Sequence, residues 1–299
     1  MKSGFVSIIG RPNVGKSTLM NAILGQKIAI MSDKPQTTRN IISGIYTKED
    51  CQIIFVDTPG IHKPVSELGQ RMTEAAYSQI KGVDAIFYMV SSYDKAGLGD
   101  EMILEKLKTA KSPVYLIINK IDLLKNRADI DKVIMEYKDK IDFKGVFPVS
   151  AKEKTNLTFL LDEIKELLPE GPQYYPADQV TDHPEQFIIC EMIREKILYF
   201  TKEEVPHSVA VTIEYMQPSK DIPDVIECHA NIFVERKSQK GILIGHQGQM
   251  MKKIKQNAKR DIRNLLGNNI DLQLWVKVKD DWRNKSASLR VLGYHTDNF

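Results

Sequence analysis

Short apolar runs alternate with longer segments of mixed polarity over the first 168 residues. The apolar runs lie at residues 5–9, 51–56, 83–90 and 114–118. Apart from Asp84, the last two are continuously apolar, which is typical of strands buried on both faces of a sheet. A helix is predicted over 16–24, and apolar residues recur at helical spacing around 102–107 and 157–168. This alternation indicates right-handed crossovers and a mostly parallel sheet, the α/β class.

The hydrophobic pattern changes after residue 168. Helix-breaking residues cluster there, at Pro169, Gly171, Pro172, Pro176 and Pro184. Such a cluster predicts a linker. The elements predicted beyond it are a helix over 185–200, strands over 209–215 and 226–234, a strand-like segment at 241–244, a helix over 250–266, a strand over 272–278 and a short helix at 286–292. We therefore expect a first domain over 1–170, a linker over 171–184 and a second, smaller α+β domain over 185–299.

Composition narrows the class of protein. A length of 299 residues fits about two domains, and 42% apolar with 27% charged residues excludes a disordered chain. The net charge of +3 excludes a polycation. Cys51, Cys190 and Cys228 are too scattered for a disulfide framework, and free thiols fit a reducing cytosol. No apolar run has the ~18 residues of a membrane span and the N-terminus resembles no signal peptide, so we expect a cytoplasmic protein.

Residues 10–17 match the phosphate-loop pattern G-x-x-x-x-G-K-[ST], between a predicted strand and a predicted helix. Gly10 and Gly15 allow several backbone N–H groups to face one point at a helix N-terminus, where an anion is favoured. Lys16 is expected to bridge the β- and γ-phosphates of a nucleotide, and Ser17 to bind Mg²⁺. The expected nucleotide contacts of this segment are Gly10, Arg11, Pro12, Asn13, Val14, Gly15, Lys16, Ser17 and Thr18.

An Asp-x-x-Gly motif follows the predicted strand at 51–56. Asp57 is therefore expected at the carboxyl end of a strand, near the phosphate loop, where it would hold a Mg²⁺-bound water. The Gly60 N–H would contact the γ-phosphate. A Thr-Thr-Arg sequence at 37–39 lies in the preceding loop, and a threonine there can close over Mg²⁺ in the triphosphate state only. The expected contacts around the motif are Asp57, Thr58, Pro59, Gly60 and Ile61.

An Asn-Lys-x-Asp motif at 119–122 follows the buried strand that ends at residue 118. The carboxylate of Asp122 can accept hydrogen bonds from the guanine N1–H and 2-amino groups. Adenine lacks both donors, so ATP would leave Asp122 unpaired, which gives large discrimination. A Ser-Ala-Lys sequence at another strand end would turn a backbone N–H onto the guanine O6. The expected base contacts are Asn119, Lys120, Asp122, Ser150, Ala151 and Lys152.

The order of these motifs resembles the translation-factor-related class of small GTPases. The resemblance implies that GTP and GDP are the nucleotides, that 61–76 is switch II, and that Thr38 is the switch I ligand of Mg²⁺ beside Ser17 and Asp57. Ile61 stands where Ras-like proteins have a water-orienting Gln, so hydrolysis depends on another group. In related GTPases an Asn in the loop helps bind K⁺, which makes Asn13 a candidate and K⁺ a further expected cofactor; a plain turn residue is the alternative. The implied catalytic residues are Asn13, Lys16, Thr38, Asp57 and Gly60.

The second domain carries a G-x-x-G sequence at 245–248 and a basic helix after it. The net charge is −7 over 181–235 and +8 over 236–263, so the positive charge is local. It forms either a solvated helix face or a surface for nucleic-acid phosphates. The element order resembles a type II KH domain, whose G-x-x-G loop holds the backbone of single-stranded RNA. The expected RNA contacts are Gly245, His246, Gln247, Gly248, Lys252, Lys253, Lys255, Lys259 and Arg260.

A GTPase domain joined to a type II KH domain in about 300 residues resembles the Era family of bacterial GTPases. The resemblance implies a monomer that binds the 3′ end of small-subunit (16S) ribosomal RNA, acts in assembly of the small ribosomal subunit, and has peripheral contact with the cell membrane. One alternative is a membrane-associated switch that uses the basic helix on anionic lipid. RNA binding would need the loop at 245–248, whereas lipid binding would need only charge. An RNA-modifying GTPase is disfavoured, because 181–299 offers no evident catalytic group.

Overall fold

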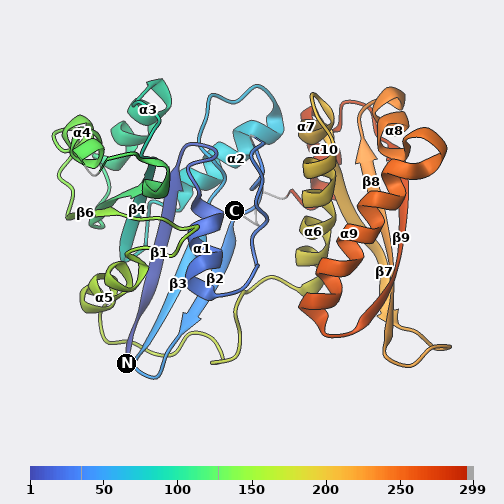
Figure 1. Ribbon diagram of the computed structural model, residues 1–299, viewed down its shortest axis with the longest axis horizontal. Coiled ribbons are helices and arrows are strands. Elements are labelled where there is room, and N and C mark those ends of the chain that lie inside the picture. The colour runs from blue at the N-terminus through green and yellow to red at the C-terminus, as the bar shows by residue number, and fades with distance from the viewer. Residues whose placement is uncertain (35, 127, 295–299) are drawn as a thin grey trace.

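Six strands form one sheet in the N-terminal half of the computed structural model, which describes residues 1–34, 36–126 and 128–294 (Figure 1). The strands are β1 (Lys2–Gly10), β2 (Ile42–Thr47), β3 (Cys51–Asp57), β4 (Ala85–Ser91), β5 (Val114–Asn119) and β6 (Gly145–Pro148). Their order is β2-β3-β1-β4-β5-β6, and every pair is parallel except β2 with β3. The predicted mostly parallel α/β sheet is therefore confirmed. The helices are α1 (Lys16–Leu24), α2 (Glu67–Ser78), α3 (Leu98–Leu107), α4 (Ala128–Tyr137) and α5 (Leu157–Leu167).

Alternate side chains of the central strands enter two separate cores. In β1, Ile8 packs with α1 and α5, whereas its neighbour Ile9 packs with α2, α3 and α4. The strands β3, β4 and β5 are buried along their whole length, as their continuous apolar sequences predict. Helices therefore cover both faces of the sheet and leave its carboxyl edge for the loops that carry the motifs.

The strand β2 was not predicted from the sequence. It forms the antiparallel edge of the sheet, and a tight connection in which Lys48 N donates to Cys51 O (2.8 Å) joins it to β3. Ser43 and Gly44 interrupt its apolar residues, so its hydrophobic pattern is weak. Pairing with β3 compensates for this weak local preference.

The second domain has a three-stranded sheet, β7-β8-β9, with β7 antiparallel and β9 parallel to β8. Its elements are α6 (Glu185–Phe200), α7 (Val205–Ser208), β7 (Ala210–Pro218), β8 (Val225–Val234), α8 (Lys237–Ile244), the 3₁₀ turn η2 (His246–Gly248), α9 (Gln249–Leu266), β9 (Asn269–Val278), the 3₁₀ turn η3 (Trp282–Asn284) and α10 (Ser286–Val291). The long helices α6 and α9 pack together and cover one face of the sheet (Figure 1). The expected α+β class is confirmed.

The segment at 241–244 is helical, so the prediction of a strand there is wrong. It forms the second half of α8. The side-chain oxygen of Gln239 accepts hydrogen bonds from the N–H groups of Glu235 (2.9 Å) and Arg236 (3.0 Å) and so caps the helix N-terminus. Leu243 alone is buried in this apolar run, while Ile242 and Ile244 are exposed. A run of four apolar residues does not separate a strand from one turn of helix.

The segment between the domains lies along the edge of the first sheet. The buried amide of Gln52 accepts hydrogen bonds from the N–H groups of Tyr174 (2.7 Å) and Tyr175 (3.0 Å) and donates to Tyr175 O (2.8 Å). Further on, Ile45 N donates to Val180 O (2.9 Å). The connection is thus fixed to β2 and β3 over much of its length. No helix among the described residues is long and apolar enough to cross a membrane.

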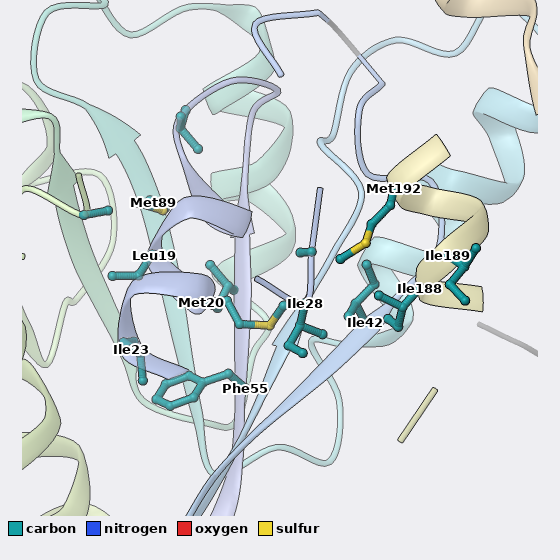
Figure 2. Packing of buried hydrophobic residues seen from close by; sticks show 14 of the residues in the cluster. Leu19, Met20, Ile23, Ile28, Ile42, Phe55, Met89, Ile188, Ile189 and Met192 are labelled. Atoms are coloured by element: carbon teal, nitrogen blue, oxygen red, sulfur yellow. The ribbon is translucent and has the colours of Figure 1, made fainter. Parts of the chain in front are cut away.

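The hydrophobic core continues from one domain into the other. Figure 2 shows Ile188 and Met192 of α6 beside Ile28 and Ile42 of the first domain, and all four belong to one buried cluster. A second shared cluster joins α2 to the C-terminal segment around Trp282. Because both contacts involve loops or helices next to the nucleotide motifs, the position of the second domain bears on the site.

Candidate functional site

The phosphate loop connects β1, which ends at Gly10, to α1, which begins at Lys16. Gly15 has a φ of 104°, and a Cβ there would lie 2.3 Å from Asn119 Nδ2. A Cβ on Gly10 would lie 2.4 Å from Met89 O. Only glycine fits either position, because one needs left-handed backbone and both lie against neighbouring atoms. The loop thereby ends at the N-terminus of α1, which favours an anion.

Lys16 is buried at the mouth of this loop. Its Nζ donates to the carbonyls of Gly10 (3.2 Å) and Arg11 (3.0 Å). Burial lowers the pKa of Lys16 to about 8, and the nearby carboxylate of Asp57 opposes the shift. A buried cation without a full counter-charge is favourable only where an anionic ligand supplies that charge.

Three oxygen-bearing side chains meet beside Lys16. The Ser17 hydroxyl donates to Asp57 Oδ2 (2.6 Å), and Ser17 Oγ lies 2.9 Å from Thr38 Oγ1. Burial raises the pKa of Asp57 to about 6, with Lys16 and the two hydroxyls opposing the shift. The other carboxylate oxygen, Oδ1, is buried without a hydrogen-bond partner in the described part of the chain. Hydroxyl and carboxylate oxygens are the donors that Mg²⁺ prefers, so this group fits the predicted ligand set.

The base-recognition motifs come together at the other end of the phosphate loop. The buried side chain of Asn119 donates to Val14 O (2.9 Å) and accepts from Ala151 N (2.9 Å). Asp122 accepts a hydrogen bond from the Ser150 hydroxyl (2.6 Å). The two short motifs at 119–122 and 150–152 are therefore joined into one unit, as their positions at neighbouring strand ends predict.

A cavity of about 830 Å³ runs over the phosphate loop. Its lining includes the predicted residues Pro12, Asn13, Gly15, Lys16, Ser17, Thr18, Thr38, Gly60 and Lys120. It also includes six residues that no sequence motif predicts: Met31, Lys34, Gln36, Tyr93, Tyr199 and Lys202. Tyr199 and Lys202 come from the second domain, and no motif distinguishes them from other surface residues. Only the packing of the two domains brings them to the nucleotide cavity.

Several predicted contacts lie outside that lining. Arg11 Nε is 3.0 Å from Asp100 Oδ2, so this side chain is directed toward α3. The Thr58 hydroxyl donates to Ile8 O (2.7 Å), and Ile61 packs in the core among α2, α3 and α4. Val14 and Pro59 are buried and also lie outside the lining of the cavity. The remaining predicted contacts outside the lining are at the base-recognition end: Asn119, Asp122, Ser150, Ala151 and Lys152. The side chains of Arg11, Val14, Thr58, Pro59 and Ile61 therefore do not line the cavity, and their contact with the nucleotide stays a prediction for the backbone.

The two switch segments touch each other next to Gly60. His62 Nδ1 lies 2.9 Å from Gly60 O, and His62 Nε2 lies 2.9 Å from Gln36 Nε2. A Cβ on Gly60 would lie 2.7 Å from Pro12 Cα, so the phosphate loop and switch II approach as closely as backbones can. The sequence offers no signal for the Gln36–His62 contact. The two switch segments are thus in contact at the edge of the cavity.

The G-x-x-G loop connects α8 to α9 in the second domain. Gly245, Gln247 and Gly248 all have positive φ, at 70°, 49° and 76°. A Cβ on Gly245 would lie 2.6 Å from Met250 Cβ, whereas Gly248 faces open space. The side chains of His246 and Gln247 are exposed at the tip. At its two glycines the loop presents peptide groups without side chains at the N-terminus of α9. This arrangement suits contact with the phosphates of a nucleic acid.

Helix α9 is amphipathic. Ile254, Ala258 and Ile262 are buried at a spacing of four residues. The exposed face carries the predicted basic residues Lys252, Lys253, Lys259 and Arg260. Lys255 is half-buried, and its Nζ donates to Gln273 Oε1 (3.2 Å). Lys253 Nζ lies 4.5 Å from the centre of the Phe200 ring. The basic face is therefore continuous with the loop, although two of its lysines already have partners.

Comparisons with known proteins agree with this arrangement. A family model described as a 50S ribosome-binding GTPase matches residues 5–120, and a KH-domain model matches residues 204–283. A crystal structure of a variant of Aquifex aeolicus Era bound to GDP and AlF4⁻ is 36% identical, with a TM-score of 0.93 over 98% of this chain and 99% of that chain. Era in complex with MgGDPNP and nucleotides 1506–1542 of 16S ribosomal RNA is 37% identical, with the same TM-score and coverage. With such identity over nearly its whole length, the chain belongs to the Era family of GTPases.

Proposed function

We propose that this Era-family GTPase couples GTP hydrolysis to binding of the 3′ end of small-subunit ribosomal RNA, and that it acts in assembly of the small ribosomal subunit. The observation that carries the proposal is the meeting of Ser17, Thr38 and Asp57 beside the buried Lys16, in a chain that also presents a G-x-x-G loop and a basic helix face. The relative solved with MgGDPNP and 16S ribosomal RNA supports both the nucleotide-binding part and the RNA-binding part of this proposal.

The residues divide the work at the nucleotide. Lys16 and the N-terminus of α1 bind the phosphates, and Asp122 selects guanine. Bound Mg²⁺ would neutralise charge that develops on the phosphates, with Ser17 and Thr38 as ligands and Asp57 acting through a water. Because Thr38 lies in a switch segment, bound Mg²⁺ and the γ-phosphate would hold it beside Ser17 in the triphosphate state.

We further propose that K⁺ assists hydrolysis through Asn13. The Asn13 amide donates to Asp33 O (2.8 Å), so its side-chain oxygen is the atom left for a cation at the edge of the cavity. Turnover should rise when K⁺ replaces Na⁺, and Asn13→Ala should remove the rise. Equal turnover in both salts would exclude this role.

In the second domain, the loop at 245–248 would hold the RNA backbone and the exposed basic face of α9 would add charge. The single experiment that tests the function measures GTP hydrolysis in K⁺ buffer with and without an oligonucleotide matching the 3′ end of small-subunit ribosomal RNA. We expect RNA to stimulate hydrolysis through the apolar contacts that join the second domain to the segments around the nucleotide motifs. Coupling between the two sites is reciprocal for binding free energies, though not necessarily for the rate of hydrolysis.

Gly248→Asp is the informative variant, because it places a negative charge at the N-terminus of α9. The matched control is Gly267→Asp at the other end of the same helix, where φ is also positive (71°) and space is also open. RNA binding and stimulation should be lost in Gly248→Asp and kept in Gly267→Asp. Binding to anionic vesicles that survives Gly248→Asp, with no RNA binding in the unchanged protein, would favour the membrane-associated alternative.

We also make proposals about the oligomeric state of the protein and its location in the cell. We expect a monomer, which sedimentation at micromolar concentration measures, and a cytoplasmic location with peripheral contact at the inner face of the cell membrane. Cell fractionation with and without high salt tests the latter, because contact that depends on basic charge is released as ionic strength rises.

A further inference from the structure

Thr38, the proposed Mg²⁺ ligand, is flanked on both sides by contacts with the second domain. On one side, Arg194 Nη2 of α6 donates to the carbonyl of Thr37. On the other side, Arg39 reaches the segment between α6 and β7, where it donates to Val209 O (2.6 Å), His207 O (3.1 Å) and Pro206 O (3.2 Å). The Thr37 carbonyl and the Arg39 side chain, on either side of Thr38, are therefore held by atoms more than 150 residues away in the chain.

Both arginines are themselves held firmly. Arg194 is 1% exposed, and its guanidinium makes two hydrogen bonds to the Glu191 carboxylate, from Nε (2.8 Å) and from Nη2 (2.5 Å). Arg39 is fully buried, with its guanidinium 5.8 Å from the centre of the Trp282 ring. An arginine stays charged at any ordinary pH, so a buried one without partners is costly. The contacts to the second domain therefore strongly favour this conformation of switch I.

We propose that Arg39 and Arg194 are positioning residues, through which the second domain holds the peptides around Thr38 so that its hydroxyl stays beside Ser17 and Asp57. The inference rests on the proposed role of Thr38 as a Mg²⁺ ligand. The new element is that the contacts of the second domain with the residues around Thr38 help to complete the metal site.

A specific consequence follows from the state in which Thr38 acts. Because Thr38 closes on Mg²⁺ only in the triphosphate state, the two arginines should increase the affinity for a Mg²⁺–GTP analogue and leave that for GDP unchanged. A hydrogen bond to a charged group is typically worth a factor of about 10 to 100 in an equilibrium constant. Loss of the Arg194 contact should therefore raise the Mg²⁺ concentration that half-saturates GDPNP binding about tenfold or more.

The experiment uses the full chain with Arg194→Gln, and titrates Mg²⁺ against a fluorescent GDPNP and, separately, a fluorescent GDP. The double variant Glu191→Gln/Arg194→Gln avoids leaving Glu191 buried and unpaired, so it guards against a folding defect. In both variants we expect the Mg²⁺ requirement for GDPNP to rise and GDP affinity to stay within about twofold of the unchanged protein. Arg194→Lys keeps one donor toward Thr37 O and should restore part of the effect.

Arg71→Gln is the matched control. Arg71 in α2 also contacts the second domain, where it donates to Tyr294 O (2.9 Å) and to Ser286 Oγ, but it does not touch the peptides around Thr38. Its substitution should leave the Mg²⁺ requirement unchanged. The proposal is overturned if Arg71→Gln has the same effect as Arg194→Gln, or if Arg194→Gln changes GDPNP and GDP binding equally or not at all. If the unchanged protein binds GDPNP without regard to Mg²⁺, the proposed function itself fails.

Discussion

The side chain of Asn119 joins the two ends of the nucleotide site, and its removal should be costly. It is 2% exposed, and its amide makes one hydrogen bond to the phosphate loop at Val14 O and one to the loop at Ala151 N, each 2.9 Å long. Asn119→Ala deletes both bonds and leaves a buried carbonyl and a buried N–H without their partner.

The magnitude follows from those two groups. A buried polar group left unsatisfied costs about 1–3 kcal/mol, so the free energy of unfolding should fall by about 2–6 kcal/mol. Asn119→Asp separates the two contributions. It keeps the acceptor for Ala151 N–H but places a carboxylate oxygen against Val14 O, so we expect a loss at least as large despite its nearly equal shape.

Urea unfolding of the nucleotide-free chain, followed by circular dichroism, measures the loss of stability, and calorimetry measures the affinity for GDP. The matched control is Asn257→Ala in α9, where the amide donates only to Lys253 O of its own helix (2.9 Å). That change should stay within about 0.5 kcal/mol. A loss below about 1 kcal/mol for Asn119→Ala, or an unchanged GDP affinity, would refute the view that this side chain joins the loops.

Three further outcomes are expected. Gly15→Ala should lower GDP affinity at least about tenfold in calorimetry, because φ is 104° there and the new Cβ would lie 2.3 Å from the Asn119 amide. Burial raises the pKa of Asp57 from 3.8 to about 6, so its contribution to the stability of the nucleotide-free protein is lost as pH rises through about 6. Asp57→Asn should thus raise the melting temperature at pH 7.5 more than at pH 5, while abolishing Mg²⁺-dependent GTP binding. Asp122→Asn should exchange guanine for xanthine preference, measured by competition between GTP and XTP.

Much of the first domain was predictable because its signals are local. The helix over 16–24 and the buried strands β3, β4 and β5 follow from continuous apolar runs and a glycine turn, which act over a few residues. The strand β2 was missed because Gly44 and Ser43 weaken its pattern, and pairing with β3 decides it. The helix α8 was mistaken for a strand because its apolar run is short and Leu243 alone is buried.

In the candidate site, too, local sequence predicted some features and tertiary contacts decided others. Spacing alone predicted where Gly15, Lys16 and Asp57 lie, since each is at a strand end or a helix start, and parallel strands bring such ends to one edge. Spacing could not show that the side chains of Thr58 and Ile61 turn away into the core, because a motif records which residues are present and not where each side chain points.

The sequence by itself determined the chemistry of this protein: a phosphate loop, a guanine-selecting motif and a G-x-x-G loop before a basic helix, each a short run whose backbone geometry its own residues impose. Only the tertiary structure decided how the two domains meet. It placed Tyr199 and Lys202 at the nucleotide cavity, brought Arg194 to the carbonyl of Thr37 and brought Arg39 to Val209 O of the second domain. Those contacts join residues far apart in the chain, and they arise from the burial of a shared apolar surface, which no local pattern encodes.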